Sequence, residues 1–331
     1  MMHSLQKPAG WKPKIVVIGV GGGGGNAVDN MITQALSGVD FLAANTDAQA
    51  LVKSKAPQVV QLGLKVTEGL GAGSLPAIGR AAAEESIHEI MEHLAGYHMC
   101  FIACGMGGGT GTGAAPVIAR VARQAGILTV AVVTEPFVFE GSHRMRQAKE
   151  GIEQLLEVAD TVIVVPNQSL FRLSAPHTTL AEAFASADAV LYAGVSSIVD
   201  LILKEGVVNL DFADVKAIMR DMGMAVMGTG DAAGPGRATA SAKAALENPL
   251  FGDAILRDAK GVLVSISAGR DLTLFEVDEA AGRIREQVDG NAEIIFGASF
   301  DESLRDRMRV SLIATGIGLA ARAPLLVDRV A

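Results

Sequence analysis

The chain has little that would suit an oxidising compartment or a highly charged partner. Only two of its 331 residues are cysteines, Cys100 and Cys104. Four apart on a strand, they point to one face but lie too far apart to bond, so two small buried thiols in a reducing cytosol are expected. There is no basic run, and 28 Lys and Arg against 36 Asp and Glu give a net charge of −8. This balance disfavours nucleic acid and anionic membranes as partners.

No signal peptide and no uninterrupted apolar run of membrane length are visible. Residues 1–14, MMHSLQKPAGWKPK, are polar with two prolines and are typical of a loose tail. The longest apolar stretch, 180–203, is interrupted by Glu182, Asp188 and Asp200. It therefore predicts a buried helix in a soluble, cytoplasmic protein, without direct membrane insertion.

Apolar runs alternate with amphipathic helical patterns along the first half of the chain. Continuous apolar strands separated by helices predict an α/β fold, with a Rossmann-like, doubly wound parallel sheet covered on both faces. The predicted strands are 14–20, 40–47, 56–63, 98–105, 127–136 and 161–167. The predicted helices include 26–36, 79–94, 114–126 and 144–159.

A long apolar segment, 180–205, separates this half from the rest. As a helix it would span about 39 Å, and because it is apolar nearly all round it should be buried on every side between two domains. Beyond it, a second, smaller α+β sandwich is expected. Its predicted strands are 224–232, 261–269, 292–300 and 309–318, with helices near 238–247 and 274–288. The predicted domains are a flexible tail 1–12, a domain 13–206 that includes the central helix, a domain 207–323 and a short tail 324–331.

Two glycine-rich segments each follow a predicted strand and precede a helix. They are GVGGGGGNAV, 19–28, and GGGTGTG, 107–113. Glycines let the backbone approach a phosphate, and a helix N-terminus supplies free N–H groups. Thr110 and Thr112 add hydroxyls that can donate to phosphate oxygens. Two such loops at one sheet edge favour a polyphosphate chain held from both sides.

The first loop alone also fits a dinucleotide dehydrogenase. It contains G-x-G-x-x-G, and Asp47 past the second strand could bind a ribose. An NAD-dependent oxidoreductase is therefore the alternative class. No P-loop motif is present and neither loop contains lysine, so backbone dipoles and a cation, Mg²⁺ by default, should neutralise the phosphates. His88 and His93 are five residues apart rather than the four of a zinc-protease helix, so no protein metal site is predicted.

The segment NLDFADV, 209–215, places two carboxylates three residues apart. Asp211 can cap a helix beginning at Phe212, with Asp214 in its first turn. The central helix carries this segment away from the phosphate loops. These carboxylates should therefore not reach the nucleotide of their own chain, but could reach that of a neighbour stacked head to tail in a filament.

Six motifs occur in the order found in one family. GVGGGGGNAV, ANTDAQAL, GLGAGS, GGGTGTG, FEGSHRMRQA and NLDFADV make the chain resemble the bacterial FtsZ family of tubulin-like GTPases, from about Lys14 to Gly318. The resemblance implies the tubulin/FtsZ fold, GTP or GDP with Mg²⁺, head-to-tail protofilaments and hydrolysis completed at the subunit interface. It implies ring formation in cell division, or a specialised paralogue role such as a magnetosome-linked one, at midcell or another site of filament assembly. A structural polymer subunit with residual GTPase activity is the third interpretation.

The resemblance also implies residue roles. The nucleotide-contacting residues would be Gly22, Gly23, Gly24, Gly25 and Asn26 in the first loop, Gly71, Ala72 and Gly73 beside the γ-phosphate, Gly107, Gly108, Gly109, Thr110, Gly111, Thr112 and Gly113 in the second loop, Glu140 and Arg144 at the ribose and phosphate edge, and Asn167, Phe184 and Asp188 at the guanine. Asp188 could accept from guanine N1–H and the exocyclic amine, a donor pair that adenine lacks. Asp211 and Asp214 would orient water and hold a cation beside a neighbour's γ-phosphate, with Asn209 shaping the loop.

Three features depart from the family pattern. Ala189 stands where a second polar residue is usual, and Ala77 stands where an acid is common. The chain stops at APLLVDRVA, without the linker and tether-binding peptide of typical members. We therefore expect a truncated chain or a tail-less paralogue. Its partners would be itself and a full-length family member, and recruitment by tether proteins is not expected.

Overall fold

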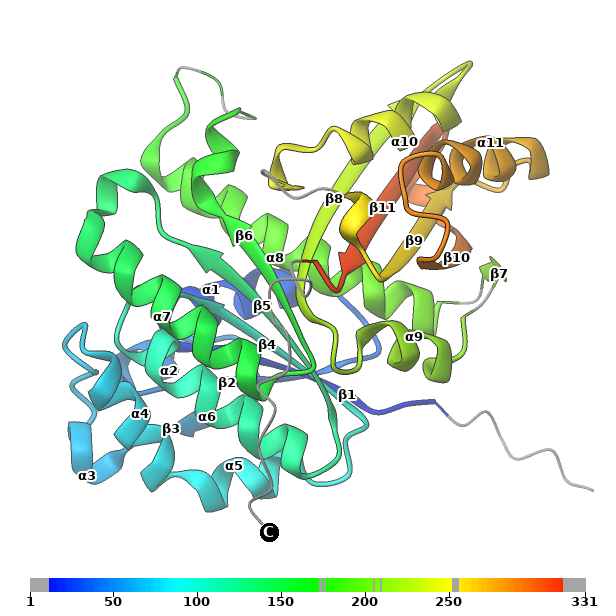
Figure 1. The fold of residues 1–331 in the computed structure, drawn as a ribbon. Coiled ribbons are helices and arrows are strands. Elements are labelled where there is room, and N and C mark those ends of the chain that lie inside the picture. The colour runs from blue at the N-terminus through cyan, green and yellow to red at the C-terminus, as the bar shows by residue number, and fades with distance from the viewer. Residues whose placement is uncertain are drawn as a thin grey trace, which may run out of the picture.

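The computed structural model describes residues 12–172, 175, 177–204, 206–208, 210–251 and 256–317. Within these residues two α/β halves lie on either side of a long helix, α8 (Figure 1). Their strands form one eleven-stranded sheet with the order β3-β2-β1-β4-β5-β6-β8-β11-β9-β10-β7.

The N-terminal half is the predicted doubly wound parallel sheet. Its strands are β1 (Ile15–Val20), β2 (Asp40–Asn45), β3 (Gln58–Gln61), β4 (Met99–Gly105), β5 (Leu128–Glu135) and β6 (Thr161–Pro166). Val16 and Ile18 of β1 belong to one core, whereas Ile15 and Val17 belong to another. Successive side chains point to opposite faces of a strand, so a strand covered on both faces must be apolar throughout.

Helices cover both faces of this sheet. They are α1 (Gly21–Thr33), α2 (Ala48–Lys53), α3 (Leu64–Thr67), α4 (Pro76–Glu85), α5 (Ile87–Leu94), α6 (Thr110–Gln124) and α7 (Ser142–Val158). The prediction of one helix over 79–94 is wrong, because α4 and α5 are separated at Ser86. The Ser86 hydroxyl accepts a hydrogen bond from the Gly63 N–H at 3.0 Å. Two helices also begin earlier than predicted, inside the glycine segments, since α1 begins at Gly21 and α6 at Thr110.

Helix α8 (Leu180–Leu203) joins the two halves. Thr179 and Glu182 form a capping box at its start, and the buried Leu191, Val195 and Ile198 pack in a core that also contains residues of the C-terminal half. The prediction of burial on every side is wrong for the first turns, where Leu180 is 60% exposed. By length and composition this described helix could cross a membrane, but half of its apolar window is buried inside the protein, as in a core helix.

The C-terminal half contains the predicted four strands and two helices. Its elements are β7 (Gly206–Val208), α9 (Phe212–Met219), β8 (Gly223–Ala233), α10 (Arg237–Leu246), β9 (Gly261–Ala268), α11 (Leu274–Arg285), β10 (Glu293–Phe300) and β11 (Arg307–Thr315). β11 runs antiparallel to β8 and β9, and β9 is parallel to β10. The strands of this half continue the N-terminal sheet, because β6 pairs with β8 from Thr161↔Gly223 to Ile163↔Ala225.

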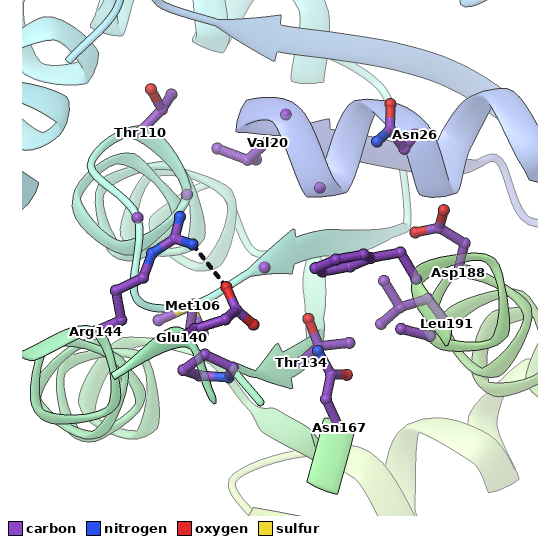
Figure 2. Close-up of a pocket in the computed structure, with 18 of the residues that line it drawn as sticks. Val20, Asn26, Met106, Thr110, Thr134, Glu140, Arg144, Asn167, Asp188 and Leu191 are labelled. Atoms are coloured by element: carbon purple, nitrogen blue, oxygen red, sulfur yellow. Dashed lines mark hydrogen bonds and ion pairs between the residues drawn. The ribbon is translucent and has the colours of Figure 1, made fainter. Parts of the chain in front are cut away.

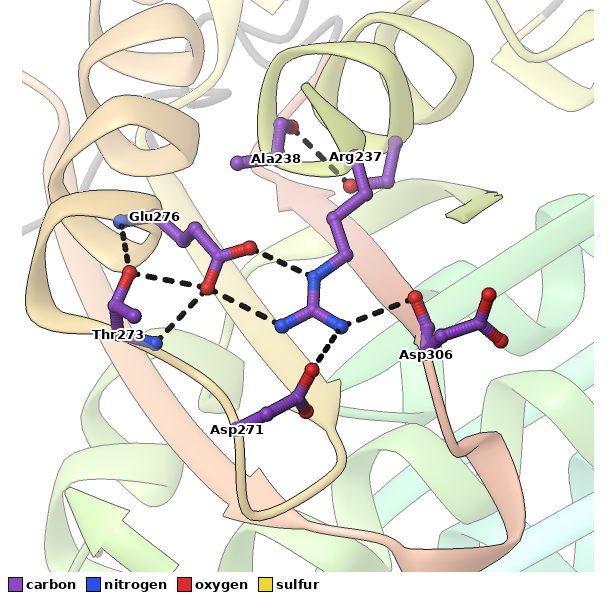
Figure 3. A network of polar contacts seen from close by, with 7 residues as sticks. Arg237, Ala238, Asp271, Thr273, Glu276 and Asp306 are labelled. Carbon is purple, nitrogen blue, oxygen red and sulfur yellow. Dashed lines mark hydrogen bonds and ion pairs between the residues drawn. The ribbon is translucent and has the colours of Figure 1, made fainter. Parts of the chain in front are cut away.

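A buried arginine ties the C-terminal helices together (Figure 3). Arg237, 5% exposed, pairs with Glu276 at 2.7 Å and with Asp271 at 2.8 Å, and donates to the Asp306 carbonyl at 3.0 Å. The hydrogen bond from Arg237 lowers the pKa of Glu276 to about 2. The guanidinium therefore links the start of α10 to the start of α11, where Thr273 and Glu276 form a capping box.

Candidate functional site

A cavity of about 450 Å³ opens at the carboxyl edge of the N-terminal strands (Figure 2). Its walls come from the starts of α1 and α6, from α7 and α8, from the ends of β1, β4 and β5, and from Asn167, which directly follows β6. The predicted nucleotide-contacting residues that line it are Gly22, Gly23, Asn26, Gly108, Gly109, Thr110, Gly111, Glu140, Arg144, Asn167, Phe184 and Asp188. The structure therefore brings together residues from four of the five groups to which nucleotide contacts were assigned.

Two helix N-termini meet at this cavity. Neither α1 nor α6 has a side-chain cap at its N-terminus. The first N–H groups of a helix have no partner within the helix, and the helix dipole makes this end positive. An anion between the two helices could accept from both sets of N–H groups.

The glycines of the two loops differ in what they make room for. A Cβ at Gly24 would lie 2.2 Å from the Ala103 carbonyl oxygen, and one at Gly111 would lie 2.5 Å from the Gly105 carbonyl oxygen, so these glycines allow close packing of the backbone. A Cβ at Gly22 or Gly108 would meet nothing within 4 Å. Both of these positions line the cavity, which leaves their surface for a ligand.

Eight predicted contact residues do not line this cavity, namely Gly24, Gly25, Gly71, Ala72, Gly73, Gly107, Thr112 and Gly113. Thr112 is buried, and its hydroxyl accepts from the Gly107 N–H at 2.8 Å. A Cβ at Gly113 would lie 2.0 Å from the Pro76 carbonyl oxygen. These two residues of the second loop thus shape the protein around the cavity. In contrast, Thr110 lines the cavity while its hydroxyl hydrogen-bonds that of Thr46 at 2.6 Å.

The cavity contains little positive side-chain charge. Among its described lining residues, Arg144 is the one cation, and it pairs with Glu140 at 2.6 Å. Glu140 also accepts from the Phe137 N–H at 2.8 Å. Burial raises the pKa of Asp188 to about 6. A bound polyanion would therefore depend on N–H groups, one arginine and any cation that it carries.

The opposite side of the cavity can recognise a planar base. Asn167 is 4% exposed, and its Oδ1 has no hydrogen-bond partner. A buried acceptor without a donor costs free energy, which a ligand N–H would recover. Phe184 packs edge-on against the buried Phe137 at 5.4 Å between ring centroids. Asp188 lies on this side, opposite Arg144 and Thr110 (Figure 2).

Several lining residues were not predicted from the sequence. They are Val20, Ser74, Gly105, Met106, Thr134, Pro136, Ala187 and Leu191. Ala187 and Leu191 could have been found, because positions three and four apart from Phe184 and Asp188 share one helix face. Ser74 carries no local signal, since its place depends on contacts with distant segments.

The acidic segment lies outside the cavity. Asp211 is the N-cap of α9, as predicted, and its N–H donates to Asp214 Oδ2 at 3.2 Å. Both carboxylates are exposed and neither lines the cavity. Helix α8, about 36 Å long, stands between the cavity and this segment. Asn209 lies outside the described residues.

Other candidate groups have structural roles. The Asp47 carboxylate, considered above for a ribose, caps α2 by accepting from the Gln49 N–H at 2.8 Å. Cys100 and Cys104 are buried free thiols, as predicted, and burial raises the pKa of Cys104 to about 12. In the described part of the chain, no group of three His, Cys, Asp or Glu side chains could hold a metal ion.

The fold and the cavity define a class of protein, in which a doubly wound domain presents helix N-termini to a cavity and a long helix joins it to a second domain. Comparison with known proteins narrows this class. The GTPase domain model of the Tubulin/FtsZ family matches residues 14–175, and the C-terminal domain model of the FtsZ family matches residues 223–318. The chain belongs to the FtsZ family, and this membership sets aside the dehydrogenase interpretation.

Individual relatives agree with this assignment. Cell division protein FtsZ 2 of Rhizobium meliloti (strain 1021) is 66% identical over 306 residues, which cover 92% of this chain and 88% of the relative. FtsZ 1 of the same organism is 62% identical over 323 residues, covering 97% of this chain but 55% of the relative. The chain thus spans just over half the length of several relatives that it matches. An FtsZ dimer structure from M. jannaschii superposes with a TM-score of 0.89 at 44% identity, covering 94% of this chain and 90% of that one.

Proposed function

We propose that the chain binds GTP and GDP in this cavity and hydrolyses GTP as it assembles head to tail into protofilaments. The observation that carries the proposal is the pairing of two uncapped helix N-termini with an unpartnered, buried amide oxygen across one cavity. The first feature suits phosphates, and the second suits a base that donates N–H groups. The match of residues 14–175 to the GTPase domain model of the Tubulin/FtsZ family supports the same proposal.

The base side would select guanine. Asp188 would accept from N1–H and the exocyclic amine, Phe184 would offer a ring face, and Asn167 would add its free oxygen. Adenine has no matching donor pair and would leave these acceptors unsatisfied. Preference for GTP over ATP should therefore be strong.

Backbone groups would bind most of the phosphate chain. The open positions Gly22 and Gly108 admit it, Thr110 adds a hydroxyl and Arg144 adds a charge. The remaining predicted glycines, Ala72 and Thr112 would shape these loops. At this side Glu140 is already paired with Arg144, so phosphate oxygens and water would supply most Mg²⁺ ligands. When bound, Mg²⁺ would neutralise phosphate charge.

Hydrolysis would be completed by the next subunit. Neither carboxylate of the cavity lining is placed to act on the attacking water, since Glu140 is paired with Arg144 and Asp188 lies at the base side. Asp211 and Asp214 are exposed at the other end of α8, where a head-to-tail neighbour could be reached. Such a contact does not close on itself and extends into a filament. Asn209 would shape the same segment, and the division into domains 13–206 and 207–323 would put the two half-sites on different domains.

The test is the GTPase rate per subunit as a function of protein concentration. We expect the wild-type rate to rise steeply above a threshold concentration, whereas Asp214→Ala stays slow but still binds GTP. Glu92→Ala removes an exposed carboxylate on α5 and should behave as wild type. A wild-type rate independent of concentration, or a fully active Asp214→Ala, would overturn the proposal.

The relatives' names, cell division protein FtsZ 1 and FtsZ 2, support a role in cell division. We propose a cytoplasmic filament at midcell, formed by this chain alone or with a full-length FtsZ, and a specialised role such as a magnetosome-linked one is the alternative. A fluorescent fusion that forms midcell bands supports division. Filaments that form only at another structure would favour the specialised role.

A further inference from the structure

A loop of residues 69–75 lies beside the second glycine segment, and one of its residues, Ser74, reaches the cavity. The Gly71 N–H donates to the Thr46 carbonyl at 3.2 Å, which fixes one end of the loop. A Cβ at Gly109 would lie 2.9 Å from the Ala72 side chain and 2.8 Å from the Leu75 nitrogen. The 69–75 loop therefore rests directly on the residue that precedes α6, and its Ser74 lines the cavity.

This loop has an unusual backbone that needs support. Gly69, Gly71 and Gly73 have φ values of 77°, 87° and 58°, and Ser74 has a φ of 61°. Glycine adopts such left-handed values freely, whereas a residue with a side chain is strained there. The strain at Ser74 persists only if surrounding contacts hold the loop in place.

Gln147 of α7 provides such a contact from across 73 residues of sequence. It is 9% exposed, and its Nε2 donates to the Ser74 carbonyl at 3.3 Å. Its Oε1 is buried without a hydrogen-bond partner. Across the described residues, the only other side-chain atom in this condition is Oδ1 of Asn167, which lies in the cavity lining. Both unpartnered acceptors thus belong to the surroundings of one cavity.

The position of Gln147 relates it to the phosphate side. Arg144, one turn earlier on α7, lines the cavity opposite Asp188 (Figure 2). A nucleotide with its base near Asp188 would extend its phosphates towards Arg144 and the 69–75 loop. The last phosphate would then lie near Ser74, which lines the cavity, and the loop would be placed to distinguish a triphosphate from a diphosphate.

We propose that Gln147 is a positioning residue that holds the 69–75 loop against the terminal phosphate and so gives the site its preference for GTP over GDP. The inference rests on the proposed function of the cavity. In the bound state Oε1 of Gln147 accepts a hydrogen bond from the 69–75 loop. The hydrogen bond from Gln147 Nε2 to the Ser74 carbonyl already keeps the loop within reach of this amide. Arg144 and Gln147 share one helix, so the loop and the arginine are positioned together.

The test compares Gln147→Met with Gln154→Met, which makes the same change at an exposed position of α7. Methionine preserves the volume but neither donates to Ser74 nor leaves an unpaired acceptor. Affinities for GTP and GDP are measured for each variant, and their ratio is compared. Unfolded protein binds neither nucleotide, so its presence cancels in the ratio.

We expect Gln147→Met to lower the GTP-to-GDP affinity ratio about tenfold, the equivalent of one lost hydrogen bond. Gln154→Met should leave the ratio unchanged. Gln147→Glu, which as a carboxylate cannot donate to the Ser74 carbonyl and adds negative charge near the terminal phosphate, should lower the ratio at least as much as Gln147→Met. Adding Ser74→Gly to Gln147→Met should restore part of the ratio, because glycine adopts the loop's backbone without support.

An unchanged ratio in Gln147→Met, or equal losses for both nucleotides, would overturn the inference while leaving the proposed function intact. A wild-type chain that binds neither GTP nor GDP would overturn the proposed function and this inference with it.

Discussion

The two ends of α8 carry opposite kinds of chemistry. At its start, Phe184 and Asp188 face a cavity that contains uncapped helix N-termini and an unpartnered amide oxygen. Beyond its end, Asp211 and Asp214 are exposed and form a helix cap with each other's backbone and side chain. One end has hydrogen-bonding groups without partners, whereas the helix start at the other end is capped within its own chain. This difference supports the proposal that the cavity binds the nucleotide and that the acidic segment acts on the nucleotide of a neighbouring subunit.

The strongest test of this comparison separates the charge of Asp214 from its cap. Asp214→Asn retains a side-chain oxygen for the Asp211 N–H but loses the negative charge. We expect the GTPase rate to fall at least about 100-fold, the scale of losing a group that acts on the attacking water. GTP affinity measured by equilibrium binding should change less than about twofold. Glu92→Gln is the control, and a parallel loss of binding would mean that the two ends are not separate.

A second test asks whether the C-terminal half can be weakened without touching the cavity. Arg237→Met leaves Glu276 and Asp271 without their buried partner, and we expect a loss of about 2–3 kcal/mol in unfolding free energy, because both acids are partly solvated. Urea denaturation measures this loss. Nucleotide affinity at low denaturant should stay the same, and a large change in affinity would contradict the separation.

The same arginine makes a pH prediction. Because the folded-state pKa of Glu276 is lowered to about 2, its stabilisation is present above its unfolded pKa of about 4.5 and is lost as pH falls towards 2. Arg237→Met should flatten this acid-dependent part of the stability curve. Denaturation at pH values from 7 to 3 measures it, and identical slopes in the two proteins would contradict the link.

GTP affinity should depend on pH near 6, because the base side of the cavity contains Asp188. Burial raises the pKa of Asp188 to about 6, and a protonated carboxyl cannot accept from both guanine donors. GTP affinity should therefore fall up to about tenfold per pH unit below 6. Asp188→Asn should bind weakly at every pH between 5 and 7.5. A wild-type profile without a change near pH 6 would indicate that Asp188 does not bind the base.

The smallest expected effect concerns the open glycine positions. Gly108→Ala should leave the unfolding free energy within about 0.5 kcal/mol, because its Cβ meets nothing. GTP affinity should nevertheless fall several-fold if phosphates occupy this space. Gly111→Ala is the contrasting variant, since its Cβ would lie 2.5 Å from the Gly105 carbonyl oxygen, and it should destabilise the protein by about 1–3 kcal/mol. Equal losses of unfolding free energy in the two variants would contradict the distinction between open and closely packed glycines.

Much of the fold could be predicted because its signals are local. Strands such as Ile15–Val20 are apolar on both faces, and Asp211 precedes a helix with a second acid in its first turn. The break at Ser86 was missed, and the hydrogen bond that its hydroxyl accepts there comes from Gly63, 23 residues earlier in the sequence. The continuous sheet was missed because the pairing of Thr161 with Gly223 joins segments that no periodicity relates.

The sequence by itself determined the strand–helix order, the two glycine segments at strand ends and the separation of the acidic segment from those glycine segments by one long helix. These properties follow from periodicity, glycine content and helix length, which act over neighbouring residues. Only the tertiary structure decided which glycines remain open, that Thr112 turns away to bond Gly107, and that Gln147 meets Ser74. Such contacts depend on how elements that are distant in the sequence pack together, and local sequence patterns do not specify this packing.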